Sequence, residues 1–320
     1  MGEFEVIRRF FQRPPRRADV VLGSGDDCAL LRVPADQLLA VSTDTLVSGV
    51  HFFADVDPVA LGHKALAVNL SDLAAMGAEP CWASLALTLP EIDEAWLAGF
   101  ARGFLALAEA HGVDLIGGDM TRGPLAITVS IKGTVPERQA LRRNGAAVGD
   151  GIYVCGELGS AALALAHRLQ GVAVAPEDYP HLQRALEYPQ PRIALGMALR
   201  GIASSCLDLS DGLASDLGHL LRASGVGAGI DLAALPLSAA VAAQPQALGW
   251  QLALAGGDDY ELCFTVPKSR QAALASLSAD LALPLTRIGQ IVAGEPRIEW
   301  QFANEPRTLQ LQGWDHFKES

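Results

Sequence analysis

Short apolar runs alternate with helical stretches along this chain, and the alternation restricts the fold more than any other feature. Residues 38–44 read as a strand, residues 58–78 as a long and mostly apolar helix, and residues 94–111 as a second helix ended by Gly112. Strands that alternate with helices predict an α/β protein. Its sheets are expected to be mixed, an arrangement also described as α+β.

The other predicted elements extend this pattern to both halves of the chain. A short helix is predicted over residues 4–12, and a polar, proline-bearing loop around residues 171–181. The helix over residues 210–224 is predicted to have Ser210 as its N-cap and Asp211 in its first turn. The remaining strands are expected at 85–89, 113–119, 125–135, 152–156, 202–210, 228–232, 261–266, 285–292 and 297–301, and further helices at 160–169 and 191–200.

A boundary between two domains is predicted within residues 136–151, which carry turn signals and few apolar side chains. A chain of 320 residues is long enough for two domains of ordinary size. The predicted domains are an N-terminal α/β domain over residues 1–137 and a C-terminal α/β domain over residues 148–320.

Composition excludes several classes of protein. Half of the residues are apolar, which favours a packed core, and the net charge of −12 argues against a nucleic-acid partner, which would need a basic face. No apolar run approaches the ~20 residues that span a bilayer, so no membrane partner is expected. The five cysteines are far apart and form no CxxC, which predicts reduced thiols in a cytoplasmic protein. Cys28 is expected to be buried.

Acidic residues recur at the ends of the apolar segments. A single Asp beside Gly is common turn chemistry, because Asp bonds to its own backbone. However, Asp72 lies in an otherwise apolar helix, where an unpaired charge is costly, and Asn69 shares its face. The pattern occurs six times: GSGDDC (23–28), STDT (42–45), NLSDLAAMG (69–77), GGDMT (117–121), DLSDG (208–212) and GGDDYEL (256–262).

So many carboxylates would repel one another if they met without cations. Oxygen ligands without paired His or Cys favour Mg²⁺, Ca²⁺ or Mn²⁺ over zinc, and Mg²⁺ usually shares its ligands with phosphate. The glycines beside the acids let a backbone approach phosphate groups. No Walker A loop or protein-kinase signature is present. The residues alone therefore indicate a magnesium-dependent nucleotide enzyme of an unusual type.

Six motifs, in order, resemble the thiamine-monophosphate kinase family: GDDCAL, STDTLV, NLSDLAAMGA, IGGDMTRGP, DLSDGLASDLGH and GGDDYELCFTVP. The family belongs to a superfamily with aminoimidazole ribonucleotide synthetase, selenophosphate synthetase and a hydrogenase-maturation factor. The resemblance covers essentially the whole chain. It implies two α/β domains, a homodimer formed through the N-terminal sheets, several Mg²⁺ ions, and ATP-dependent phosphorylation of thiamine monophosphate, the final step of thiamine diphosphate biosynthesis.

The resemblance also implies roles for individual residues. Matching nucleotide contacts are Gly118, Asp119, Arg143 and Ser210, and matching substrate contacts are His51, Asp258 or Asp259, and Trp314. Because related chains often carry Glu where this chain has Asp258, the choice between 258 and 259 stays open. The expected catalytic group is Asp27, Asp44, Asp119, Asp211 and Arg143. The positions that match metal ligands are Asp27, Ser42, Thr43, Asp44, Asp72, Asp119, Asp208 and Asp211.

Plainer interpretations remain open at this stage. Trp314 could fill the core, His51 could be a hydrogen-bonded histidine without a proton role, and Arg143 could lie in a solvated loop. Two alternative functions also remain: another ATP-dependent synthetase of the superfamily, and a magnesium-nucleotide-binding protein without turnover. A structural calcium module is excluded, because the spacing of an EF-hand loop does not occur.

Overall fold

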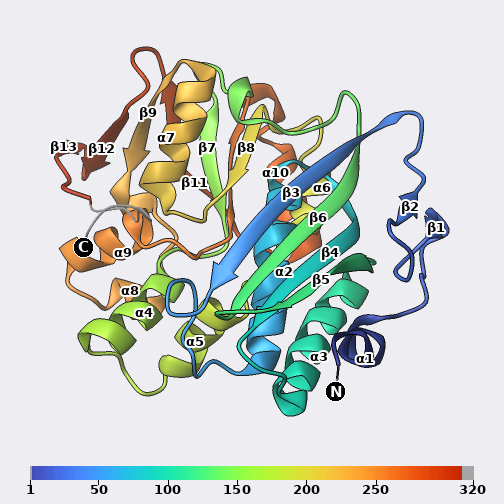
Figure 1. Ribbon diagram of the computed structural model, residues 1–320. Helices are drawn as coiled ribbons and strands as arrows, with labels where there is room; N and C mark the ends of the chain where they lie inside the picture. Colours follow the sequence, from blue (N-terminus) through green and yellow to red (C-terminus); the bar gives the residue numbers. More distant parts are fainter. Residues whose placement is uncertain (1, 312–320) are drawn as a thin grey trace. The chain divides into compact units, whose positions relative to one another are not determined.

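The computed structural model describes residues 2–311 of the chain (Figure 1). Its contacts divide the chain into two compact units. One comprises Met1–Leu73 and Ala78–Ala140, and the other comprises Ala74–Gly77 and Leu141–Ser320. Each unit has its own sheet, as expected for two α/β domains with mixed sheets.

The first unit is built on a four-stranded sheet in the order β3-β6-β4-β5. The strands are β3 (Gln37–Val47), β6 (Ala126–Pro136), β4 (Glu79–Leu89) and β5 (Asp114–Arg122). All neighbours are antiparallel except β4 and β5, which are parallel. Apolar side chains such as Leu87 and Ile127 alternate with polar ones and are buried on one face. Figure 1 shows α2 (Pro58–Ala75) and α3 (Glu94–Ala110) beside the sheet.

The N-terminal segment packs beside α3. Helix α1 (Glu3–Val6) continues into a π-helical stretch, η1 (Ile7–Phe11), so helical structure occurs where it was predicted. Phe11 is buried and meets the ring of Phe100 edge-on at 6.4 Å between centroids. The chain then forms the short strands β1 (Val20–Leu22) and β2 (Leu30–Leu31). The segment therefore stays on the first unit.

The second unit has a seven-stranded sheet in the order β13-β12-β9-β11-β7-β10-β8. Only β12 and β9 are parallel; the other neighbours are antiparallel. Strands β7, β10 and β8, which lie at one side of this sheet, are buried along their length. The strands are β7 (Gly151–Cys155), β8 (Ser205–Asp208), β9 (Gly227–Asp231), β10 (Leu262–Val266), β11 (Leu285–Val292), β12 (Ile298–Phe302) and β13 (Glu305–Arg307).

The helices of this unit pack their apolar sides onto the sheet and onto each other. One core joins Leu217 and Leu221 of α7 (Leu213–Ser224) to Ile152 and Ile288 in the sheet. The expected loop over residues 171–181 is partly wrong, because α5 begins at Tyr179 with Pro180 in its first turn, a favoured place for proline. Besides α7, the helical segments of this unit are α4 (Ser160–Gln170), α5 (Tyr179–Glu187), α6 (Ile193–Ala198), α8 (Ala239–Ala242), α9 (Gln246–Ala255), α10 (Ala273–Leu281), η2 (Arg143–Gly145), η3 (Leu232–Ala234) and η4 (Lys268–Arg270).

No helix within residues 2–311 has both the length and the apolar character needed to cross a membrane.

Candidate active site

Strand β3 and helix α2 hold four of the predicted residues together in the first unit. The Ser42 hydroxyl donates to a carboxylate oxygen of Asp72 at 2.5 Å. One turn earlier on α2, the side-chain oxygen of Asn69 accepts from the backbone N–H of Asp44 at 3.1 Å. The spacing of three residues therefore does place Asn69 and Asp72 on one face of the helix, facing β3. Ser42 partly compensates the cost of placing the Asp72 carboxylate in an apolar helix.

Thr43 lies on the opposite face of β3, because side chains alternate along a strand. Its side chain is exposed, whereas Ser42 and Asp44 are half-buried. The predicted metal positions on this strand therefore do not all face the same way.

Strand β5 carries the second predicted cluster, Gly117-Gly118-Asp119. A side chain at position 118 is excluded, because its Cβ would lie 1.8 Å from the carbonyl oxygen of Leu85 on the neighbouring strand. Asp119 is exposed and pairs in register with Ala86. The close packing at Gly118 fixes the backbone that presents Asp119, and leaves that backbone accessible from the edge of the sheet.

The acidic loop that carries Asp26 and Asp27 lies near this edge. Asp26 accepts the backbone N–H of Asp27 at 2.9 Å, a local bond typical of Asp in turns. Both acids are exposed, and so is Cys28, so the expected burial of this thiol is wrong. The apolar run that follows Cys28 begins only after the loop has turned, and Leu30 is itself exposed.

A cavity of about 780 Å³ brings these elements together within the first unit. Such a volume is typical of small-ligand sites. Its lining includes Asp27 of the acidic loop, and Gly118 and Asp119 of β5. Apolar side chains such as Phe4, Ile7 and Phe11 also line it. The cavity therefore places three of the predicted site residues around one space.

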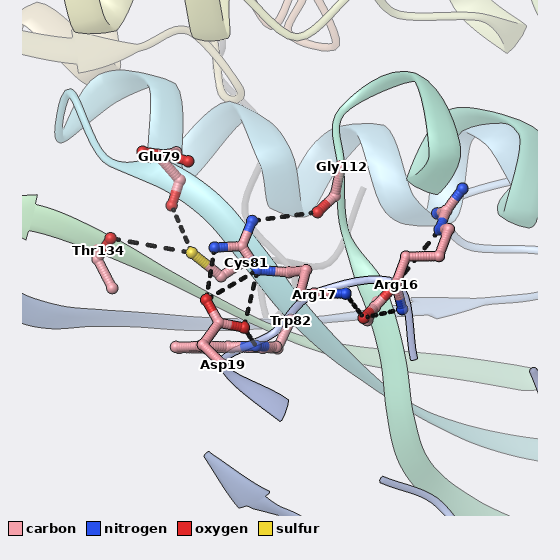
Figure 2. A network of polar contacts seen from close by, with 9 residues as sticks. Arg16, Arg17, Asp19, Glu79, Cys81, Trp82, Gly112 and Thr134 are labelled. Carbon is pink, nitrogen blue, oxygen red and sulfur yellow. Dashed lines mark hydrogen bonds and ion pairs between the residues drawn. The ribbon is translucent and has the colours of Figure 1, made fainter. Parts of the chain in front are cut away.

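A polar network anchors the chain between the N-terminal helix and the acidic loop (Figure 2). The carboxylate of Asp114 accepts the backbone N–H groups of Arg16 and Arg17, each at 2.9 Å. The Arg17 side chain donates to Asp19, and Trp82 donates its indole N–H to the same carboxylate at 3.0 Å. Burial opposes ionisation of Asp19, but the bonds from Arg17 and Trp82 outweigh it and hold its pKa below the usual value. This network ties the segment between the N-terminal helix and the acidic loop, which both line the cavity, to β4 and β5.

His51 forms a local hydrogen bond in the first unit. Its Nδ1 accepts the backbone N–H of Val47 at 3.0 Å, and the ring is half-buried. This bond fixes the ring at the end of β3 and leaves the hydrogen-bonded, non-catalytic interpretation of His51 intact.

In the second unit, the loop between β8 and α7 carries Asp208, Ser210 and Asp211. The predicted N-cap is wrong: α7 begins at Leu213, its N-cap is Gly212, and no side chain caps it from that position. The reason is the backbone, since Gly212 has φ +98 and a Cβ there would lie 2.8 Å from the Cα of Ala255. Asp211 therefore precedes the helix and is exposed, whereas Asp208 is buried at the end of β8.

The GGDDYE segment binds the same loop through its backbone. The carbonyl of Ser210 accepts the N–H of Asp258 at 2.9 Å, and the carbonyl of Leu209 accepts the N–H of Tyr260 at 2.8 Å. Two motifs nearly fifty residues apart in the sequence therefore form one hydrogen-bonded assembly. Asp258 adopts a positive φ of 61, which is tolerated better by Asp than by most residues.

Asp259 is held differently from Asp258. One of its carboxylate oxygens accepts the backbone N–H of Gly159 at 2.8 Å. Within residues 2–311 the other oxygen, Oδ2, is buried and has no hydrogen-bond partner. Burial raises the pKa of Asp259 well above its ordinary value. The two acids are thus not equivalent, since only Asp258 lies in the backbone assembly with Ser210.

Two further groups support these loops and were not predicted. Asp216, buried in the first turn of α7, accepts the backbone N–H of Asp211 at 3.0 Å, and burial raises its pKa to about 7. Glu261 is buried and accepts from Arg192 and from the thiol of Cys155, at 2.9 Å from the sulfur. The sequence signal for Asp216 was its place in DLSDGLASDLGH, but nothing in the sequence pairs Arg192 with Glu261.

Arg143 lies in η2 and is exposed, and its carbonyl accepts from Ser224. Trp314 lies outside the described residues. Within residues 2–311, no three His, Cys, Asp or Glu side chains are grouped closely enough to form a metal site by themselves. The donors are nevertheless carboxylate and hydroxyl oxygens, and Mg²⁺ is often bound by only one or two carboxylates plus phosphate and water. The residues therefore fit magnesium that arrives with a phosphate ligand.

Comparison with known proteins identifies, over nearly the whole chain, the family that the sequence motifs resemble. Residues 25–135 match the N-terminal domain of AIR synthase related proteins, and residues 147–301 match their C-terminal domain. Thiamine-monophosphate kinase of Escherichia coli (strain K12) is 53% identical over 99% of this chain and 98% of that protein. The enzyme of the same name from Haemophilus influenzae is 44% identical over 100% of this chain and 99% of its own length.

Solved structures of similar proteins match most of this chain as well. The crystal structure of thiamine-monophosphate kinase from Stenotrophomonas maltophilia K279a has a TM-score of 0.85 and 47% identity, covering 91% of this chain and 93% of its own. The structure named AaThiL complexed with AMPPCP and TMP has a TM-score of 0.78 and 30% identity, covering 89% of each chain.

Proposed function

Because the chain belongs to the thiamine-monophosphate kinase family, within the AIR synthase related proteins, we propose that it transfers a phosphoryl group from ATP directly to thiamine monophosphate. The products are thiamine diphosphate and ADP. The observation that carries this function is full-length similarity to thiamine-monophosphate kinases at 53% identity, with all six acidic motifs present. A structural relative binds an ATP analogue and TMP, both of which fit this reaction.

The reaction depends mainly on how the two phosphate groups are positioned and on how their negative charge is neutralised. A phosphate monoester has a second pKa of about 6, so the acceptor is mostly a dianion at neutral pH and needs no general base. The barrier is the repulsion between two anions, which catalysis overcomes by orientation and by neutralising charge. Bound magnesium would supply positive charge that this chain, with a net charge of −12, lacks. Its own residues then have to hold the two anions in line and keep them in place.

We assign the nucleotide to the cavity of the first unit, with its phosphates toward Asp27, Gly118 and Asp119. The support is the lining, which offers oxygen ligands, an open glycine backbone and apolar side chains around one space. Asp44, Asp72, Ser42 and Thr43 are the further metal ligands proposed in this unit. Of these, Ser42 and Asp72 already share a hydrogen bond.

The proposed residues of the second unit are Asp208 and Asp211 for metal, and Ser210 and Arg143 for nucleotide. A guanidinium such as that of Arg143 can bind a phosphate through two parallel hydrogen bonds. His51, Asp258, Asp259 and Trp314 are the proposed substrate contacts. Asp258 is favoured over Asp259, because it belongs to the hydrogen-bonded assembly that presents Ser210.

Product analysis tests the function. The purified protein is mixed with ATP, Mg²⁺ and thiamine monophosphate, and the products are identified by mass spectrometry, with a chelator as control. We expect thiamine diphosphate and ADP in equal amounts, both abolished by the chelator. Consumption of ATP without thiamine diphosphate would indicate another synthetase of the superfamily, and no consumption at all would indicate a binding protein.

We also propose that the chain forms a homodimer through the sheet of its first unit. Strand β3 is at the edge of that sheet, and it exposes Leu38, Leu39 and Val41 by 42, 48 and 57%. An exposed apolar edge strand favours pairing with another chain. A cytoplasmic location is proposed as well, since all five cysteines are free thiols.

Light scattering measures the proposed dimer. The wild type is expected to give twice the mass of one chain, and Val41→Lys, which places a charge on the exposed edge, is expected to give mostly monomer. Leu169→Lys is the control, because Leu169 is 63% exposed on α4 in the other unit. A wild-type mass of one chain would rule out the dimer.

A further inference from the structure

Asp216 holds the backbone of the β8–α7 loop (residues 209–212) by a hydrogen bond. The residue lies in the first turn of α7 and is only 7% exposed, yet it carries a carboxylate. Burying such a group is costly unless hydrogen bonds compensate it. Its carboxylate accepts the backbone N–H of Asp211, at 3.0 Å.

The N-cap of α7 offers no side chain to the start of the helix. The first N–H groups of a helix lack partners within the helix, and a side chain at the N-cap usually satisfies one of them. Gly212 occupies the N-cap here and has no side chain to offer. The Asp216 carboxylate instead reaches past Gly212 and accepts the N–H of Asp211, which precedes the helix.

The opposite side of the loop is held by the GGDDYE segment. The carbonyls of Leu209 and Ser210 accept backbone N–H groups of that segment, and the N–H of Leu209 donates to the carbonyl of Glu261 at 2.9 Å. With its main chain bonded on both sides, the loop leaves the side chain of Asp211 exposed. The backbone is thus fixed, while the carboxylate that would meet a ligand is outside.

We propose that Asp216 is a positioning residue, which orders the Ser210–Asp211 backbone before any ligand arrives and so fixes the direction of the Asp211 carboxylate. The identity of the ligand that this loop binds rests on the proposed function. The ordering of the loop by Asp216 is independent of that function. A site whose groups are already in place loses less conformational freedom when its ligand binds. The consequence is tighter binding of a magnesium nucleotide, without contact between Asp216 and that ligand.

A residue that only stabilises its helix would behave differently, and the chain offers such a residue for comparison. Asp93 caps α3 by accepting the N–H groups of Ala95 and Trp96 at 2.8 and 3.1 Å. Helix α3 carries none of the proposed site residues. Asp93→Ala should therefore weaken the fold without changing the β8–α7 loop.

The experiment compares Asp216→Asn, Asp216→Ala and Asp93→Ala in two measurements. The first is amide hydrogen exchange of the metal-free, nucleotide-free protein; the second is calorimetric binding of a non-hydrolysable ATP analogue with Mg²⁺. For Asp216→Ala we expect exchange in residues 209–212 to accelerate about tenfold or more, with the strands of the sheet unchanged, and affinity for the magnesium nucleotide to fall about tenfold. Asp93→Ala should alter neither.

Asp216→Asn keeps the shape and one acceptor oxygen, so it should fold even if the alanine variant does not, and show a smaller acceleration. Unchanged exchange at residues 209–212 in both Asp216 variants would overturn the proposal. So would faster exchange with unchanged nucleotide affinity, because the order of the loop would then not matter for binding. If the wild type binds no magnesium nucleotide at all, the proposed function fails, whereas the exchange result still stands by itself.

Discussion

Replacing Asp211 with asparagine is expected to lower kcat by about 10²-fold or more, the loss usually seen when one preorganised electrostatic group is removed from an active site. The side chain is exposed, and its backbone N–H, not its carboxylate, makes the bond to Asp216. The substitution therefore removes one negative charge from the proposed metal ligands and leaves the loop's backbone bonds intact. Steady-state kinetics and thermal unfolding, measured on the same preparation, check both halves of this expectation.

The control for Asp211→Asn is Asp280→Asn. Asp280 is an exposed acid on α10 of the same unit, so the change of charge is identical while the proposed site is untouched. We expect wild-type kcat for this control and an unchanged melting temperature for both variants. If Asp211→Asn kept near-wild-type kcat, Asp211 would not be a metal ligand. A lowered melting temperature would indicate a structural role instead.

The sequence predicted those helices and strands in which apolar residues recur at a regular spacing. Helix α2 and strand β3 lie where the pattern placed them, and the spacing of Asn69 and Asp72 correctly put both side chains on one face. These predictions succeed because a local period of 3.6 or 2 residues already decides which face is buried. Helix α5 was missed in part, because its polar residues and Pro180 read as a loop although proline suits the first turn of a helix.

The site was predictable in its residue types but not in its pairing. The acids of DLSDG and GGDDYEL were recognised from the sequence, yet the N-cap was misplaced at Ser210, because the backbone angle of Gly212 depends on contact with α9. The partners Arg192 and Glu261 are 69 residues apart, and no local pattern joins them. Such long-range pairs depend on tertiary packing, which a single sequence does not reveal.

Breaking the buried pair of Arg192 and Glu261 is expected to have the largest effect on stability. Removing one partner of a buried ion pair costs about 3–5 kcal/mol, because the other charge is left uncompensated. Glu261 is the more buried side chain, 8% exposed against 24% for Arg192. Arg192→Met should therefore cost more than Glu261→Gln, since a remaining arginine can turn toward water. Urea unfolding measures both, and the double variant Arg192→Met/Glu261→Leu should recover most of the loss.

The loss of stability in Arg192→Met should also depend on pH, and the burial of Glu261 determines in which direction. Burial already raises the pKa of Glu261 in the folded protein, against the opposing effect of Arg192. Without Arg192 this pKa rises further, so the folded variant binds a proton more tightly than the unfolded chain, whose Glu titrates near about 4.3. A raised carboxyl pKa favours folding at low pH, and that stability is lost as the pH rises through the folded pKa.

We therefore expect Arg192→Met to be less destabilised at pH 5 than at pH 8, where Glu261 must either stay protonated or be buried as an uncompensated anion. Arg297→Met is the matched control, because Arg297 pairs with Glu299 on the surface, with side chains 68 and 52% exposed. Exposed pairs contribute less than about 1 kcal/mol, and this one should show no such pH dependence. A loss in Arg192→Met that is the same at pH 5 and pH 8 would mean that the charge of Glu261 is compensated by another group.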